Sequence, residues 1–457
     1  MRLMKPQSAP TKDPQGELFR SELNQILDMD HVLVKLSDQV NWERFDEAFG
    51  ATYCEDTGRP GTNTRLMVSL HYLKYTYDLS DESVIAGWLE NPYWQYLSGM
   101  KYFTHEAPLD SSLMTRWRKR IGESGAEELL SETLEAGLRM KAVKVCELKN
   151  VNVDTTVQEK AIRYPTDARL YDRAREHLVK AADDRGIELR QNYNRVNKHL
   201  LHQQNRYAHA RQMKRAGRCT KKMRTHLGRV IRDVERKCPQ PDEALKEELD
   251  VAKRIYEQQR HQSGKIYSVH EPEVACIAKG KAHKRYEFGS KVSVAATSKG
   301  GWCVGAKAFE GNPYDGHTLA ASLEQVERML KRAPERVFVD RGYRGHGYEG
   351  EAQVHIDRVR RGRIKRSLWK WMKRRSAIEP TIAHLKSERR MNRNQLKGTE
   401  GDRVNAVLSA AAMNFSKLLK HTEAFWRRVL SDPETRIAYH FRLKMAESRG
   451  GALPSPA

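Results

Sequence analysis

The chain has 457 residues, which is long enough for two or three domains. It carries 82 Lys and Arg against 59 Asp and Glu, a formal net charge of +23, and such an excess attracts polyanions, nucleic acid first among them. Ribosome-associated and membrane-surface proteins also reach this charge, but no apolar stretch approaches the roughly 20 residues that span a bilayer.

The cysteines and the N-terminus point to a reducing compartment. Six cysteines are scattered without a CxxC pair, which argues against structural zinc and against a disulfide framework. The first residues, Met1 to Asp30, are polar and mixed in charge, unlike a secretory signal. We therefore expect a cytoplasmic protein with reduced thiols.

Residues 1–144 are predicted to form a helical N-terminal domain that binds DNA. From Thr64 to Gly122 the apolar residues recur with helical spacing. Asp110 then starts a helix over Leu113–Ile121. This helix carries the candidate DNA contacts Arg116, Arg118 and Arg120. The alternative for this helix is a solvated surface face, but the basic composition of the whole chain favours DNA contact.

The hydrophobic period changes near Val145. Leu148–Asp154 is predicted to be a strand, in a first core segment over residues 145–167. Residues 168–262 are highly charged and helical, which predicts a helical hairpin or coiled pair inserted after this strand. A structural spacer and a DNA-contacting element are equally good interpretations of that insertion.

Strands return after the insertion, in a second core segment over residues 263–420. Strands are predicted at Val269–Ile277, Tyr286–Thr297, Trp302–Phe309, Arg336–Val339 and, weakly, Val354–Ile356. Helices are predicted at Thr318–Arg332, around Glu379 and at Val404–Leu419, and residues 421–457 as a C-terminal helix and disordered tail. This order predicts an α/β fold, a mixed sheet with flanking helices that fits the ribonuclease-H-like architecture.

Three acidic residues stand out as a candidate site. Asp154 ends the apolar run Val151–Val153, Asp340 ends the run Val337–Val339, and Glu379 lies in an arginine-rich helical segment. An Asp at the end of a buried strand is costly unless it is paired or binds a metal. Carboxylate oxygens are the ligands that Mg²⁺ prefers, and sites with two such ions promote in-line attack at phosphorus.

Each acid also has an ordinary structural interpretation. Asp154 and Asp340 are good turn residues, and Ser376-Ala377-Ile378-Glu379 has the spacing of a helix capping box. The glycines Gly342 and Gly345 after Asp340 let a backbone approach phosphate or metal closely. The conjunction of the three acids carries the functional interpretation.

At this point the chain resembles a bacterial insertion-sequence transposase of the DDE class, from roughly Arg59 to Leu419. The family's third-carboxylate signature is Tyr, two residues, Arg, three residues, Glu, six residues, Lys. Arg375, Glu379 and Lys386 match it in register, whereas Met372 stands at the Tyr position. The resemblance is also carried by Asp154-Thr155-Thr156, Tyr164-Pro165-Thr166-Asp167, the segment Gly311 to Leu319, and Asp340-Arg341-Gly342-Tyr343-Arg344-Gly345.

The resemblance implies a ribonuclease-H-like core in which Asp154, Asp340 and Glu379 are catalytic and bind two Mg²⁺ ions, for which Mn²⁺ can substitute. It implies hydrolysis of DNA at the element's ends and then transfer of the freed 3′-hydroxyl to target DNA. Arg375 and Lys386 would hold the scissile strand's phosphates. The expected partner is double-stranded DNA, bound by a dimer or larger assembly in association with the bacterial nucleoid.

Three other functions remain open from the sequence. A catalytically silent, domesticated DNA-binding protein would keep the fold without the activity. An RNA-binding scaffold built on the basic helical region would explain the charge but not the strand-end aspartates. A structure-specific nuclease of the same fold would cut without joining. Divalent-dependent strand transfer separates the transposase from all three.

Overall fold

The computed structural model describes residues 3–4, 20–50, 52–53, 59–259, 261–278, 285–357 and 365–431. The predicted C-terminal tail and part of the basic stretch before Glu379 lie outside these residues. The chain divides into two compact units. The first comprises Met1–Gln158, Lys291–Phe309 and Pro313–Ala457, and the second comprises Glu159–Ser290 and Glu310–Asn312.

The first unit begins with the predicted helical region. Its helices are α1 (Leu23–Ile26), α2 (Val32–Ser37), α3 (Glu43–Gly50), α4 (Thr64–Thr76), α5 (Asp81–Glu90), α6 (Pro92–Leu97) and α7 (Ser111–Arg139), and the short strands β1 (Leu3–Met4) and β2 (Arg59–Pro60) pair in parallel. Side chains of Asn63, Ser80, Asn91 and Asp110 accept hydrogen bonds from the first turns of α4, α5, α6 and α7, so polar caps set these helix starts.

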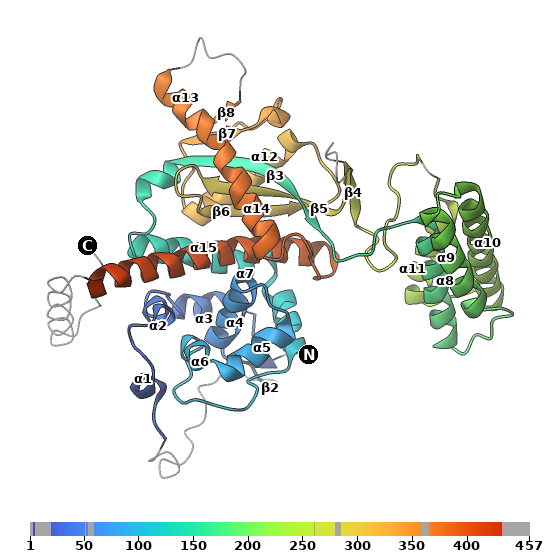
Figure 1. Ribbon diagram of the computed structural model, residues 1–457, viewed down its shortest axis with the longest axis horizontal. Helices are drawn as coiled ribbons and strands as arrows, with labels where there is room; N and C mark the ends of the chain where they lie inside the picture. The colour runs from blue at the N-terminus through green and yellow to red at the C-terminus, as the bar shows by residue number, and fades with distance from the viewer. Residues whose placement is uncertain are drawn as a thin grey trace. The chain divides into compact units, whose positions relative to one another are not determined.

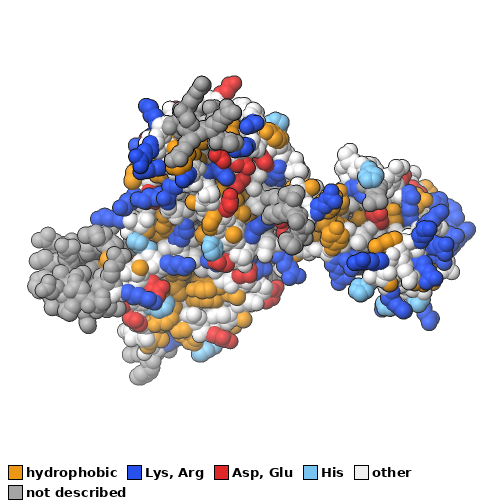
Figure 2. All heavy atoms as spheres, turned by 45° about the horizontal axis from the view of Figure 1, so that its top comes forward, with side chains coloured by type: hydrophobic (Ala, Val, Ile, Leu, Met, Phe, Trp, Pro, Cys, Tyr) orange, Lys and Arg blue, Asp and Glu red, His pale blue; other side chains and the backbone are white. Residues whose placement is uncertain are grey.

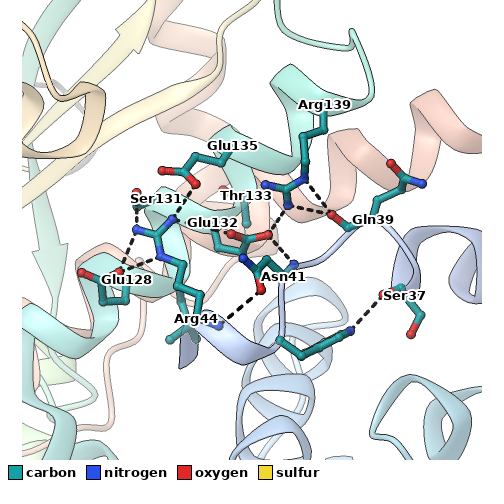
Figure 3. A network of polar contacts seen from close by, with 12 residues as sticks. Ser37, Gln39, Asn41, Arg44, Glu128, Ser131, Glu132, Thr133, Glu135 and Arg139 are labelled. Carbon is teal, nitrogen blue, oxygen red and sulfur yellow. Dashed lines mark hydrogen bonds and ion pairs between the residues drawn. The ribbon is translucent and has the colours of Figure 1, made fainter. Parts of the chain in front are cut away.

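Helix α7 extends well beyond the predicted Leu113–Ile121. Gly122 interrupts its helical geometry with a φ of +61°, a conformation that glycine adopts at little cost, and the helix then continues to Arg139. Figure 3 shows how its second half is tied to the segment around α3. Arg44 pairs with Glu128 at 2.7 Å and Glu135 at 2.9 Å, and Glu132 accepts a hydrogen bond from the backbone N–H of Asn41 at 2.7 Å.

The core of the first unit is a mixed sheet. Its strands are β3 (Asn150–Glu159), β5 (Tyr286–Thr297), β6 (Cys303–Phe309), β7 (Arg336–Val339) and β8 (Gln353–Ile356). Along the sheet the order is β6-β5-β3-β7-β8, where β5 and β6 are antiparallel and β3, β7 and β8 are parallel. β5 and β6, both predicted as strands, form an antiparallel hairpin with Gly301 at a φ of +62° in its turn.

Two predicted strands differ from the structure. β3 does not end at Asp154 but continues to Glu159, because Thr155, Thr156 and Val157 are β-branched and extend the strand. The predicted strand Val269–Ile277 is wrong over most of its length, since only β4 (Ala275–Ala278) forms, as an antiparallel partner of β5. Pro272 has no N–H to donate to a ladder, which fits its exclusion from the strand.

Helices complete this core, as Figure 1 shows. They are α12 (Asp315–Leu330), α14 (Ile378–Glu388) and α15 (Gly398–Ser431), and α13 (Arg366–Lys373), which has no buried residue, precedes α14. Helix α15 packs against α4, α7 and β6, and the rings of Phe415 and Tyr72 stack with centroids 4.7 Å apart. The strand order and the flanking helices confirm the predicted ribonuclease-H-like fold.

The second unit contains the predicted helical insertion. The helices are α8 (Asp167–Asp183), α9 (Asn194–His209), α10 (Met213–Lys237) and α11 (Glu243–Glu257), so four helices replace the expected hairpin or pair. Gly186, at a φ of +68°, follows α8, and Pro239 and Pro241 separate α10 from α11. Apolar residues of all four helices, Leu178, Leu200, Leu227 and Leu249 among them, form a hydrophobic core of their own.

Candidate active site

Asp154 lies within β3 and is half-buried. Its Oδ1 accepts a hydrogen bond from the backbone N–H of Thr155 at 2.8 Å. Asn152, two residues earlier and therefore on the same face of β3, is buried and donates its amide N–H to the carbonyl of Arg374 at 2.8 Å. This bond attaches the segment that leads to Glu379 beside the strand that bears Asp154.

Asp340 follows the last residue of β7, as predicted. β7 is the parallel neighbour of β3, and the register pairs Asn152 with Phe338. Extending that register by two residues sets Asp154 beside Asp340, and adjacent strands lie about 4.8 Å apart. The Asp340 Oδ1 accepts a hydrogen bond from Gly342 N–H at 2.8 Å, which caps the 3₁₀-helix Arg341–Tyr343.

A third aspartate, Asp315, lies next to Asp340. A Cβ built on Gly342 would lie 3.0 Å from the Asp340 Oδ1 and 3.1 Å from the Asp315 Oδ2, so the absence of a side chain at Gly342 leaves room for both carboxylates. Asp315 Oδ1 accepts hydrogen bonds from Thr155 Oγ1 at 2.8 Å and from Lys291 Nζ at 2.9 Å. Asp315 is therefore joined to β3, β5 and the turn after β7.

Sequence reasoning missed this role of Asp315 and Lys291. Asp315 was recognised only as part of the segment Gly311 to Leu319, and the helix was expected to start at Thr318, whereas α12 starts at Asp315 itself. The available signal was a lysine, Lys291, within the apolar part of a predicted strand. It is only 8% exposed, and a buried lysine needs a partner.

Tyr343 reports on the charge of this region. Its side chain is fully buried in the first unit's core. Burial, followed by the negative charges of Asp154, Asp315 and Asp340, holds the pKa of Tyr343 well above its usual range. Three aspartates from β3, α12 and the end of β7 thus gather around one tyrosine.

Glu379 occupies the first turn of α14, and its side chain is 63% exposed. The capping box considered from the sequence does not form, because Ser376 Oγ donates to the carbonyl of Lys373 instead. The guanidinium of Arg375 lies 3.8 Å from the Glu379 carboxylate. Glu379 therefore keeps most of its surface open to solvent or to a ligand.

The described residues contain no group of three or more His, Cys, Asp or Glu side chains arranged to hold a metal ion as they stand. The donor chemistry nevertheless fits a hard divalent cation, because Asp315 lies near Asp340 and is bonded to Thr155, the neighbour of Asp154, and Glu379 is exposed on the segment that Asn152 anchors beside β3.

Basic side chains accompany Glu379. Arg375 is half-buried, whereas Lys365, Arg366, Lys370 and Lys373 are exposed on or beside α13. Lys386 is half-buried on α14. Phosphate contact by Arg375 and Lys386 stays a prediction.

The three arginines predicted on α7 have different surroundings. Arg116 is exposed and donates to Ser112 Oγ at 3.1 Å, and Arg120 lies over the ring of Tyr53 at 4.9 Å. Arg118 is only 3% exposed and donates two hydrogen bonds to Asp81, at 2.8 and 2.6 Å. A buried guanidinium that is already paired cannot reach a phosphate, so Arg118 is not retained as a DNA contact.

Comparisons with known proteins agree with this geometry. Residues 21–120 match a transposase domain (DUF772), and residues 256–415 match a transposase DDE domain. The chain is 52% identical over 205 residues to an uncharacterized protein, ORF8 in the nfe locus of Rhizobium meliloti, a match covering 44% of this chain and 99% of that protein. No solved structure matches.

Within the described residues, every helix is too short or too polar to cross a membrane. The helical N-terminal match, the DDE match and the ribonuclease-H-like sheet agree with one another along the chain. The chain belongs to the DDE transposases of the insertion-sequence type.

Proposed function

We propose that the protein cuts DNA at the ends of a mobile element and joins the freed ends to target DNA, with Asp154, Asp340 and Glu379 as the catalytic acids. The observation that carries this proposal is the pairing of β3 with β7, whose register, once extended, sets Asp154 beside Asp340. The hydrogen bond from Asn152 to the carbonyl of Arg374 supports Glu379 as the third acid.

The same three acids would hold two Mg²⁺ ions, with Mn²⁺ as a substitute. When bound, these ions supply Lewis-acid activation of the attacking oxygen and stabilisation of the leaving oxygen. Asp315 remains engaged with Lys291 and Thr155, which fixes the segment beside Asp154 and Asp340. The turn at Gly342 leaves the space between the Asp315 and Asp340 carboxylates unfilled.

The proposed reaction has two steps. In the first, a water oxygen attacks a backbone phosphorus in line, the P–O3′ bond breaks, and the leaving O3′ takes up a proton to become a free hydroxyl. In the second, this 3′-hydroxyl attacks a target phosphorus, a new P–O3′ bond forms, and the target strand's own 3′-oxygen leaves. Neither step needs a covalent protein–DNA bond.

DNA would be held at several places. Arg375 and Lys386 flank Glu379 on the same segment and are proposed to bind the phosphates of the scissile strand. Arg116 and Arg120, in the helical region 1–144, are proposed to contact the terminal inverted repeats. Joining two ends requires a dimer or larger assembly, and such a protein would work at the cytoplasmic nucleoid.

The test is incubation of the full chain with a labelled duplex that carries the element's terminal repeat, with Mg²⁺ or with EDTA. We expect a Mg²⁺-dependent nick that leaves a 3′-hydroxyl, followed by joining to a supercoiled plasmid. Cutting without joining would favour the structure-specific nuclease. Binding without cutting would favour the silent DNA-binding protein, and a preference for structured RNA over duplex ends would favour the scaffold.

A further inference from the structure

The outer face of α10 is a dense array of basic side chains in the second unit. Its ten exposed cationic residues are Lys214, Arg215, Arg218, Lys221, Lys222, Arg224, Arg229, Arg232, Arg236 and Lys237. The two acids of α10 balance few of them, because Asp233 pairs only with Arg236 and Lys237 among them, and Glu235 pairs with Lys253 of α11 at 2.8 Å. Figure 2 shows Lys and Arg side chains gathered over this part of the second unit.

Several of these cations are not used by the fold. Arg224 donates to the carbonyl of Tyr256 at 2.8 Å, and Arg236 and Lys237 pair with Asp233. Arg229 donates to the hydroxyl of Tyr193 at 3.3 Å, and Arg215 donates to Gln212 at 3.0 Å, so these five have structural contacts. Among the described residues, no acid pairs with Lys214, Arg218, Lys221, Lys222 or Arg232. Their charge is therefore available to a ligand.

Helical geometry places the available cations in one stripe. Lys214, Arg218, Lys221 and Arg232 are spaced by near-multiples of 3.6 residues and lie along one side of α10. At 1.5 Å per residue the stripe is about 27 Å long. The opposite side of the helix, including Met223, Leu227 and Val234, is buried in the unit's core and holds the stripe facing outward.

Exposed cations are denser on α10 than on the other helices of its unit, although α9 also exposes Arg195, Lys198 and Arg206 and contains no acid. Helix α11, which packs against the same core, exposes the acids Glu243, Glu247, Asp250 and Glu257. Packing of the helix bundle does not require the exposed cations to be concentrated on α10 and the exposed acids on α11. The second unit therefore has a basic side built by α10.

The side chains of α10 also narrow the class of ligand. Single-stranded nucleic acid is usually held by stacking on aromatic rings, and α10 contains no Phe, Tyr or Trp. The core of a protein–protein interface needs apolar anchors, whereas the exposed large apolar residue of α10, Met213, lies at its first position. A straight row of cations matches the regularly spaced phosphates of a duplex.

We propose that the α10 stripe binds the phosphodiester backbone of duplex DNA without reading its sequence. The inference rests on the proposed function for the choice of DNA over other polyanions, but not for the existence of the stripe. In this role the insertion is a DNA-contacting element, one of the two interpretations left open by its sequence.

The test measures binding of the full chain to a 30-base-pair duplex of random sequence by fluorescence anisotropy, without divalent ions, over a range of KCl concentrations. The variant carries Lys214→Gln, Arg218→Gln and Lys221→Gln. Its control carries Lys180→Gln, Lys246→Gln and Arg254→Gln, which removes the same charge from exposed positions on α8 and α11.

We expect the slope of log affinity against log salt to fall by about one to three in the stripe variant, because each lost phosphate contact removes roughly 0.9 from that slope. The control should change it by much less. A third variant, with Arg218→Lys and both lysines replaced by Arg, should bind as wild type does, since it keeps the charge. Circular dichroism checks that all three are folded.

Equal slopes for the stripe variant and wild type would overturn the inference, as would equal losses in variant and control. Tighter binding of wild type to an RNA duplex of the same sequence would also overturn it. The result is independent of catalysis: a wild type that fails to nick DNA contradicts the proposed function, yet leaves the stripe's contribution to duplex binding to be read from the slopes.

Discussion

Two charged assemblies in the first unit differ in how their charges are matched. Beneath the N-terminal helices, Asp81 accepts hydrogen bonds from both Arg118 and Lys74, and Arg118 also contacts His71 at 3.3 Å. In the sheet, by contrast, three aspartates act together on the pKa of Tyr343. The first assembly sets two cations against one acid, whereas the second gathers three aspartates, of which Asp315 is paired with Lys291.

The difference separates a structural use of charge from a functional one. Cations around an acid stabilise its charged form. Burial by itself would raise the pKa of Asp81, but Arg118 and Lys74 hold that pKa well below its usual range. Acids held close together repel one another, and the pairing of Asp315 with Lys291 offsets part of that cost. Such an arrangement is typical of sites that bind a cation or a reacting group.

The largest expected effect breaks the aspartate assembly. Asp340→Asn should lower Mg²⁺-dependent nicking by about 10³-fold, equivalent to about 4 kcal/mol of barrier, because it removes a proposed metal ligand. Its thermal unfolding temperature should be unchanged or higher, since one like charge is lost. The measurement pairs single-turnover cleavage with a melting curve, and exposed Asp46→Asn serves as the control. Cleavage at the wild-type rate would remove Asp340 from the site.

The matching change in the first assembly should affect stability instead. Arg118→Met leaves the half-buried Asp81 with Lys74 as a partner and should cost about 1.5–3 kcal/mol of unfolding free energy, because the charged hydrogen bonds between Arg118 and Asp81 are lost. Denaturant unfolding measures this. Exposed Arg116→Met on the same helix should cost less than about 0.5 kcal/mol. Equal effects at the two positions would mean that the Arg118–Asp81 pair contributes little.

Asp315 lies at the border of the aspartate assembly and should have an intermediate effect. Asp315→Asn keeps the shape but weakens the contact with Lys291, and we expect a 10- to 100-fold loss of nicking, the range for residues that orient metal ligands. A positioning role predicts that higher Mg²⁺ concentration restores part of the rate, so the rate is titrated with Mg²⁺. A loss that no Mg²⁺ concentration relieves would contradict positioning.

The smallest effect concerns pH. Burial and then the charge of Arg118 lower the pKa of His71 to about 3. Between roughly pH 6.5 and 3, His71 is therefore protonated in the unfolded chain but neutral in the folded chain. Stability should therefore fall by about 1.4 kcal/mol per pH unit as the pH drops through this window. Urea unfolding of wild type and His71→Gln between pH 7 and 5 tests this, because the variant should show a shallower slope. Parallel slopes would contradict it.

The sequence predicted parts of the site that local rules govern. Asp340 at a strand end and the start of α7 at its Asp110 cap follow from short apolar runs and capping chemistry. Asp154 lies inside β3 and not at its end. The short apolar run before Asp154 does not indicate this, because pairing with β7 and the β-branched residues after Asp154 extend the strand.

Contacts between distant segments were out of reach of the sequence. Nothing local distinguishes Arg118 from Arg116 and Arg120, and only the packing of α5 on α7 shows that Arg118 meets Asp81. The network of Asp315, Lys291 and Thr155 joins three segments whose side chains meet only once the sheet has formed. Charge composition alone cannot tell such buried cations from the available ones on α10.

Manganese binding tests most directly whether Asp154, Asp340 and Glu379 act on one site. Free Mn²⁺ is followed by electron paramagnetic resonance during titration of the wild type and of Asp154→Asn, Asp340→Asn and Glu379→Gln, each in the presence of a terminal-repeat duplex. We expect two ions bound per wild-type active site and clear loss of binding in every variant. Variants that all bind as many ions as wild type, with the same affinity, would contradict the assignment of these three acids.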